Sequence, residues 1–155
     1  MVRGKLVIAF GTFDFLHYGH LYYLQKAKKL GGKLLVVVSR DENAFSSKGK
    51  RPIHTEKERL EIIRALRCVD NAVLGLKGSN MFEILLKYKP DVIALGYDQR
   101  VNVKELSAFI AKKGPKARII RIPAYKSHLL KSSNFRAKLK GKKEESPLEL
   151  GIDII

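Results

Sequence analysis

The chain has 155 residues, of which 45% are hydrophobic, and 31 Lys and Arg against 15 Asp and Glu give it a formal net charge of +16. This length predicts one globular domain with a substantial core, and the single cysteine excludes an internal disulfide framework. Neither a signal peptide nor a long apolar run is apparent, so we expect a cytoplasmic protein that is not associated with a membrane.

The first strand and the first helix are predicted on either side of one turn. The apolar run from Leu6 to Phe10 is typical of a buried strand, and apolar residues at every third position indicate a helix over 21–30. Residues 11–20 therefore lie at the carboxyl edge of the sheet, where open α/β sheets bind ligands. Here His17 and His20 share one face of the helix start, beside backbone N–H groups that suit a polyphosphate. The alternatives are a cap or packed core histidines, whereas a metal pair lacks a third ligand at suitable spacing.

A second strand and a polar segment follow. Gly31-Gly32 predicts the end of the first helix, and the continuous apolar run 33–39 predicts a strand that is buried on both faces. Residues 40–52 are polar and predict an exposed loop, whose centre is Lys48-Gly-Lys-Arg-Pro52.

The next helix is predicted by a capping box, with Thr55 as N-cap and Glu58 three residues later, and runs to about Arg67. Strands are then expected at 69–74, 91–95 and 117–122, and helices at 80–88 and 103–113.

Two further groups are candidates for a site. Asp98 follows the fourth strand at the same edge of the sheet as residues 11–20, which we call the histidine turn. A carboxylate at this position either binds ribose hydroxyls or stabilises an ordinary turn. Ser132 and Ser133 stand at the start of a short predicted helix, where hydroxyl residues are caps or build a second anion site.

The turn itself carries a resemblance. Gly-Thr-Phe-Asp-x-x-His-x-Gly-His over residues 11–20 resembles the signature of the HxGH nucleotidylyltransferases, specifically the cytidylyltransferase-like branch. The resemblance implies an α/β fold of one Rossmann-like domain, with a parallel five-stranded sheet and helices on both faces, over residues 1–140. Residues 141–155 form a C-terminal tail in this division.

The resemblance also implies a reaction, in which a phosphorylated acceptor attacks the α-phosphate of a nucleoside triphosphate and pyrophosphate leaves. His17, His20 and Lys48 are then the catalytic residues, and Mg²⁺ or another divalent cation arrives with the nucleotide because no metal cage is visible. The implied nucleotide-binding residues are Gly11, Thr12, Phe13, His17, Tyr18, Gly19, His20, Asp98, Tyr125, Ser132 and Ser133. Arg51 and Arg59 are candidates for phosphate binding.

Other stretches resemble the archaeal FAD synthase subgroup most closely, namely Arg40-Asp-Glu42, Lys48-Gly-Lys-Arg-Pro-Ile53, Leu95-Gly-Tyr-Asp-Gln99 and the segment from Tyr125-Lys126 to Ser132-Ser133. That resemblance implies ATP and FMN as substrates and FAD and pyrophosphate as products. The wider family is often dimeric, so a homodimer is a possible assembly. The alternative is a cytidylyltransferase that uses CTP and glycerol 3-phosphate or a similar small phosphate ester, and pantetheine-phosphate adenylyl transfer is a third.

The positive charge leaves a non-enzyme alternative, a basic nucleic-acid-binding protein. However, the lysines and arginines are spread along the chain, and neither an aromatic-interleaved RNA-binding signature nor zinc-finger spacing is present. We therefore expect no specific nucleic-acid partner.

Overall fold

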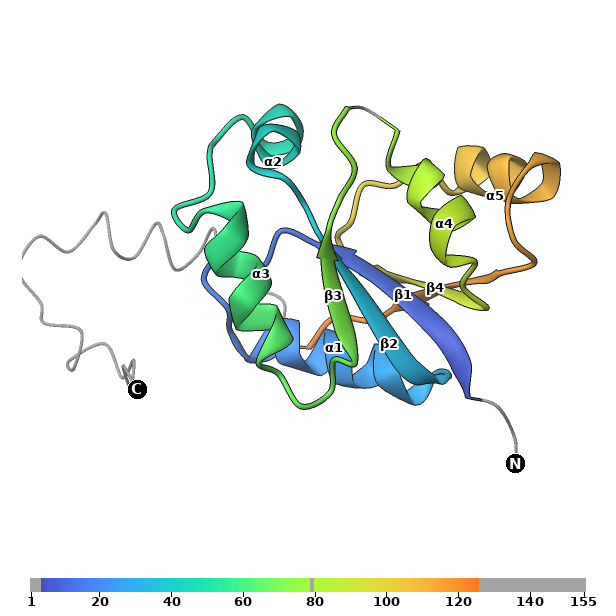
Figure 1. The fold of residues 1–155 in the computed structure, drawn as a ribbon, viewed down its shortest axis with the longest axis horizontal. Coiled ribbons are helices and arrows are strands. Elements are labelled where there is room, and N and C mark those ends of the chain that lie inside the picture. The colour runs from blue at the N-terminus through green and yellow to red at the C-terminus, as the bar shows by residue number, and fades with distance from the viewer. Residues whose placement is uncertain (1–3, 79, 126–155) are drawn as a thin grey trace, which may run out of the picture.

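The computed structural model describes residues 4–78 and 80–125, which form a three-layer α/β structure (Figure 1). The elements follow in the order β1 (Lys5–Gly11), α1 (Tyr18–Lys29), β2 (Gly32–Val38), α2 (Asp41–Lys48), α3 (Glu56–Arg64), β3 (Asn71–Leu74), η1 (Met81–Glu83), α4 (Ile84–Tyr88), β4 (Val92–Gly96), α5 (Val103–Lys112) and β5 (Arg118–Ile122). The sheet is parallel with strand order β3-β2-β1-β4-β5. The predicted α/β fold is confirmed.

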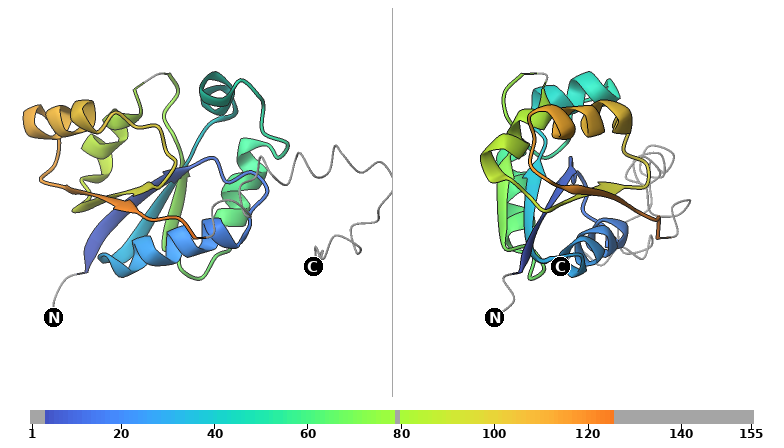
Figure 2. Two further views of the ribbon diagram at one scale, coloured as in Figure 1. Left: turned by 180° about the vertical axis from the view of Figure 1, so that it is seen from behind. Right: turned by 90° about the vertical axis from the view of Figure 1, so that its right-hand side faces the viewer.

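Both faces of the sheet are covered by helices, as the two views of Figure 2 show. Alternate residues of β1 enter opposite halves of the core, with Val7 packing on the side of α1 and α3 and Ile8 on the side of α4 and α5. The strands therefore consist of nearly continuous apolar runs, because a parallel sheet offers neither face to water. Each fully buried side chain of this kind contributes about 1.5–3 kcal/mol.

The sheet reverses its winding between β1 and β4, which places the topological switch point at the carboxyl ends of these strands. Tyr23 of α1 forms a bridge between β1 and β4. Its hydroxyl donates to the carbonyl oxygen of Ala94 at 2.9 Å, and the carbonyl oxygen of Phe10 lies 3.3 Å away. The helix that follows the histidine turn is thus fixed across the two strands that border the site.

The predicted end of the first helix is confirmed at the glycine pair. Leu30 is the C-cap of α1, and Gly32 opens β2 with a φ of +94°. A Cβ on Gly31 would lie only 2.5 Å from the carbonyl oxygen of Lys5. Only glycine allows the chain to return this closely to the start of β1.

One element was predicted wrongly. Residues 40–52 were expected to form an exposed loop, but Asp41–Lys48 form α2. The helix has only Ala44 buried, so it has no apolar periodicity for a pattern to detect. Its signals lie at the ends, where Asp41 and Lys48 match the helix dipole and Gly49 ends the helix with a φ of 70°.

The capping box that begins α3 is confirmed, and α3 ends at Arg64 rather than near Arg67. In the part of the chain that the structure describes, no helix is long and apolar enough to cross a membrane. The predicted domain boundary near residue 140 lies outside the described residues.

Candidate active site

The two predicted histidines cap the first helix with their own side chains. His17 is the N-cap of α1, and its Nδ1 accepts the N–H of Gly19 at 3.0 Å. His20, three residues later, accepts the N–H of His17 on its Nδ1 at 3.3 Å, and the two rings stack with centroids 3.9 Å apart. Because each Nδ1 is an acceptor, the proton of each neutral ring is on Nε2. The turn therefore presents two Nε2–H donors.

Both imidazoles are neutral near pH 7. Burial lowers the pKa of His20 to about 3, with the charges of His17 and Lys48 acting in the same direction and Asp14 opposing them. Burial also lowers the pKa of His17, against the nearby Asp98 carboxylate. Two stacked rings would also repel each other if both were charged. They act as hydrogen-bond donors and not as cations.

Phe13 supports this pair from the core. Its side chain is only 4% exposed, and its ring contacts His20 edge-on with centroids 5.5 Å apart. Gly11 leaves space for that ring, since a Cβ there would lie 2.5 Å from its Cζ atom. The buried ring thus holds His20 in place. The contact of Phe13 with the nucleotide that the resemblance implies stays a prediction.

Asp14 joins the histidine turn to the segment before α3. It is 6% exposed and accepts the N–H groups of Ile53 at 2.9 Å and of His54 at 3.1 Å. Sequence reasoning did not select this residue, although it lies within the quoted motif. Its partners are about forty positions away in the chain, so no local pattern indicates them.

Arg59 is the most buried charged residue of the described chain, with no exposed surface. Its guanidinium donates to the carbonyl oxygens of Thr12 at 2.6 Å, Ser39 at 2.9 Å and His54 at 3.1 Å, and to the Asp41 carboxylate at 2.7 Å. The sequence left a solvated arginine and a phosphate ligand as alternatives. The structure excludes the solvated arginine, because the side chain has no exposed surface and its guanidinium binds four acceptors of the protein. Phosphate binding by Arg59 stays a prediction, and these contacts favour a structural role.

The Asp41 carboxylate that Arg59 binds also joins two helices. Asp41 accepts the N–H of Glu56 at 3.2 Å, and Glu56 accepts the N–H of Asp41 at 2.9 Å. Arg40 extends the network, donating to Glu56 at 3.1 Å and to the carbonyl oxygen of Gly75 at 2.8 Å. The first residue of each helix thus provides an acceptor for the N-terminus of the other, and α3 has this acceptor in addition to its Thr55 cap.

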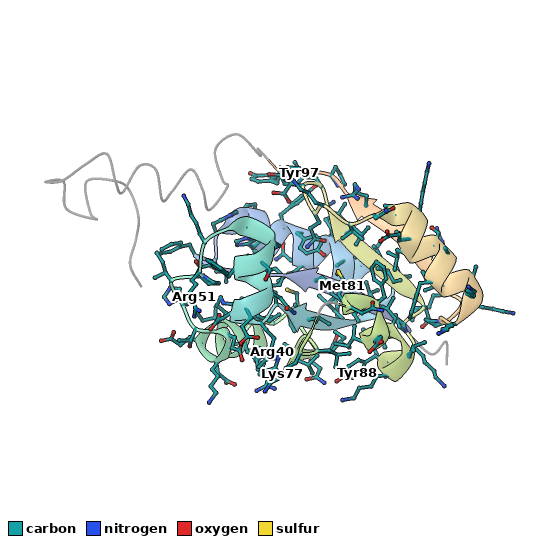
Figure 3. The ribbon with its side chains drawn as sticks, turned by 90° about the horizontal axis from the view of Figure 1, so that it is seen from above. Arg40, Arg51, Lys77, Met81, Tyr88 and Tyr97 are labelled. Atoms are coloured by element: carbon teal, nitrogen blue, oxygen red, sulfur yellow. The ribbon has the colours of Figure 1, made fainter. Side chains whose placement is uncertain are left out.

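Lys48 stands at the far end of α2, and its charge is close enough to lower the pKa of His20. It is exposed, as is Arg51, whose guanidinium lies over the Phe45 ring at 5.8 Å. The structure therefore brings Lys48 toward the histidines, while Arg51 remains on the outer side of α2 (Figure 3).

The turn after β4 faces the histidine turn from the other side. Its Asp98 is exposed, and its charge acts on His17. Gln99, which sequence reasoning also passed over, accepts the N–H of Gly96 at 2.9 Å and donates through its amide to the carbonyl oxygen of Phe10. This link between the ends of β1 and β4 holds Asp98 at the switch point.

Several remaining predicted residues lie around the start of α1. Tyr125 packs against Tyr18 and Tyr22 with ring centroids 4.8 and 5.1 Å away. The Thr12 hydroxyl oxygen accepts from Ser39 at 3.0 Å. Ser132 and Ser133 lie outside the described residues. Within the described ranges, no group of three or more His, Cys, Asp or Glu side chains could hold a metal ion.

Comparisons with known protein sequences agree with one another. The model of the family described as cytidylyltransferase-like matches residues 8–138. The FAD synthase of Thermoplasma volcanium is 46% identical over 133 residues, which are 86% of this chain and 92% of that protein. The FAD synthase of Methanosarcina barkeri is 48% identical over 120 residues, which are 77% of this chain and 84% of that protein.

Solved structures share the fold. A structure from Thermoplasma volcanium, described as a lipopolysaccharide core biosynthesis protein, has a TM-score of 0.75 at 46% identity and covers 79% of this chain and 99% of its own. A pantoate-β-alanine ligase from Francisella tularensis has a TM-score of 0.54 at 17% identity, covering 90% and 70% of the two chains. The second likeness concerns the fold alone.

Proposed function

Because the chain belongs to the cytidylyltransferase-like family, we propose that it transfers AMP from ATP to FMN and releases FAD and pyrophosphate. Proteins named FAD synthase are 42–48% identical over 77–90% of this chain, and the match covers most of each of them. The chain is therefore an enzyme of the nucleotidyltransferase class. The observation on which its mechanism rests is the stacked pair of neutral imidazoles at the start of α1, beside the switch point of the sheet.

The histidines stabilise charge and do not transfer protons. An oxygen of the FMN phosphate forms a bond to the α-phosphorus, and the bond to the pyrophosphate oxygen breaks with its electron pair. The acceptor phosphate is already ionised, so no general base is needed. His17 and His20 donate from Nε2 to the α-phosphate oxygens as negative charge grows there, alongside the first N–H groups of α1.

The leaving pyrophosphate requires cations, and Lys48 is the residue we assign to it. Its charge already acts on His20, which supports a position beside the imidazoles and therefore close to the bound triphosphate. Arg51 lies three residues further on and is a second candidate. Arg59 does not bind phosphate in this proposal. It holds α2, and therefore Lys48, against the histidine turn through Asp41.

The nucleoside lies on the other side of the histidines. In this proposal Asp98 accepts hydrogen bonds from the ribose hydroxyls, and the pair Tyr18 and Tyr125 provides aromatic surface for adenine. Ser132 and Ser133 stay predictions for a phosphate contact.

A divalent cation fits this site only when it binds together with the nucleotide. The described residues provide no cage of three ligands, and Mg²⁺ commonly binds through phosphates with one or two carboxylates, of which Asp98 is the candidate. When bound, such an ion offsets negative charge on the triphosphate.

The test is pyrophosphate release in the presence of Mg²⁺, with ATP or CTP offered against FMN, glycerol 3-phosphate and phosphopantetheine. We expect turnover with ATP and FMN together. Turnover that requires CTP would assign the protein to the cytidylyltransferase alternative. Salt-sensitive retention of RNA without turnover in any pairing would favour the nucleic-acid alternative.

A further inference from the structure

A separate hollow of about 610 Å³ opens on the α5 side of the sheet, between the segment that begins η1 and the start of α5. Phe82 and Phe109 form part of its lining, with ring centroids 5.7 Å apart, and Val101 adds to the apolar surface. Met81 stands at its edge, 39% exposed, between α2 and α5 in Figure 3. This volume lies within the range of small-ligand sites, and the open hollow combines apolar with polar lining residues.

The hollow and the histidine site are built on the same turn. Asp98 acts on His17, whereas Arg100, Val101 and Asn102 line the hollow. Gln99 lies between them and fixes the turn. Its side-chain amide donates to the carbonyl oxygen of Phe10, and its backbone carbonyl oxygen accepts the N–H of Val101 at 2.9 Å. A ligand that reaches from one site to the other therefore passes along a single turn that hydrogen bonds of Gln99 hold together.

Two amide groups of the lining are already oriented by the backbone. The side-chain oxygen of Asn80 accepts the N–H of Phe82 at 3.0 Å, and that of Asn102 accepts the N–H of Glu105 at 3.2 Å. The Nδ2 groups are the donor ends of these amides. With the guanidinium of Arg100 nearby, the hollow combines aromatic surface with several donors.

The charges decide which end of a ligand enters. Glu105 and Arg100 both line the hollow, so their opposite charges offset each other and no excess of positive charge attracts a phosphate there, whereas Lys48 and the imidazole donors lie at the histidine site. A flat ring system with oxygen and nitrogen acceptors on its edge matches the donors, and its faces match the aromatic and thioether side chains. The isoalloxazine ring of FMN has both properties.

We propose that this hollow binds the isoalloxazine ring of FMN, so that the phosphate of the same molecule points to the histidine turn. The inference rests on the proposed function and names the subsite that selects the acceptor. Met81 then packs on the ring, and Asn80, Asn102 and Arg100 donate to its edge.

The test separates the ring from the phosphate by using riboflavin, which lacks the phosphate. Flavin fluorescence gives Kd values for riboflavin and FMN, and steady-state pyrophosphate release gives KM values for FMN and ATP. The variant is Met81→Trp, which places a bulky ring at the mouth of the hollow. The matched control is Leu86→Trp on α4, because Leu86 is also 39% exposed and does not line the hollow.

We expect Met81→Trp to weaken riboflavin and FMN binding by about tenfold or more, with the KM for ATP and the behaviour of Leu86→Trp unchanged. Unchanged flavin affinity, an effect on ATP alone, or a wild-type protein that turns over FMN without binding riboflavin would overturn the inference. If Met81→Trp does not fold, Arg100→Leu is used instead, because Arg100 is exposed. We expect Arg100→Leu to bind riboflavin about threefold or more weakly than the wild type. Wild-type turnover of ATP and FMN is measured separately, so a failure of the proposed reaction is recognised on its own.

Discussion

Replacement of Arg59 by methionine removes a guanidinium that binds four acceptors from three segments of the chain. Arg59→Met keeps much of the side-chain volume but leaves the carbonyl oxygens of Thr12, Ser39 and His54 and the carboxylate of Asp41 without their donor. Breaking a buried ion pair by removing one partner costs about 3–5 kcal/mol. Each abandoned buried acceptor costs about 1–3 kcal/mol, but these losses share one network and do not add.

The Asp41 side chain is 30% exposed, so water can compensate part of the lost pairing. We therefore expect the free energy of unfolding to fall by about 3–4 kcal/mol, within the lower half of the range for buried pairs. At a urea dependence of about 2–3 kcal/mol per molar, this moves the unfolding midpoint by about 1–2 M. Circular dichroism during urea titration measures it, and m-values that match the wild type justify the comparison.

The control is Arg67→Met, since Arg67 is exposed on the surface. Its midpoint is expected to stay at the wild-type value. Arg59→Lys restores a charge for Asp41 without the planar fork, so an intermediate loss is expected. The positioning role is refuted if the free energy of unfolding of Arg59→Met lies within about 1 kcal/mol of the wild-type value, because a change this small is ordinary for a point substitution and the network would then not hold α2.

Three further outcomes follow from the site. His20→Ala lowers kcat by about a hundredfold or more because one preorganised donor is lost, and a folded variant with normal turnover would remove the histidines from the mechanism. Burial holds the pKa of His20 near 3 against an ordinary value of 6.5, so the unfolded chain binds more protons below pH 6.5 and stability falls as the pH is lowered. Between pH 7 and about pH 5 the free energy of unfolding of the wild type should fall by about 2 kcal/mol because of this group. Urea titrations at both pH values measure the fall, and in His20→Asn it should be about 2 kcal/mol smaller than in the wild type. Lys48→Ala should lower kcat more than it raises the KM for FMN, and an effect confined to that KM would place Lys48 in the acceptor site.

The local signals in the sequence were sufficient for most of the fold. Apolar runs predicted the parallel strands, and the Thr55 capping box predicted the start of α3. The spacing of His17 and His20 placed both rings on one face of a helix start, where the structure finds them stacked. These features depend on residues within about four positions of each other, which a sequence pattern can report.

The support of the site was decided by tertiary structure alone. Three hydrogen bonds of the site join residues that are far apart in the sequence. Gln99 donates to Phe10 over a separation of 89 positions, Arg59 donates to Thr12 over 47 positions, and Asp14 accepts from His54 over 40 positions. These contacts exist because parallel strands bring the turns after β1, β2 and β4 to one edge of the sheet. The residue types at these positions are ordinary for exposed polar turns, so burial and pairing become visible only when the strands are packed side by side. The chain sequence thus determines which groups can perform the chemistry, and the packing of the sheet determines which of them hold the others in place.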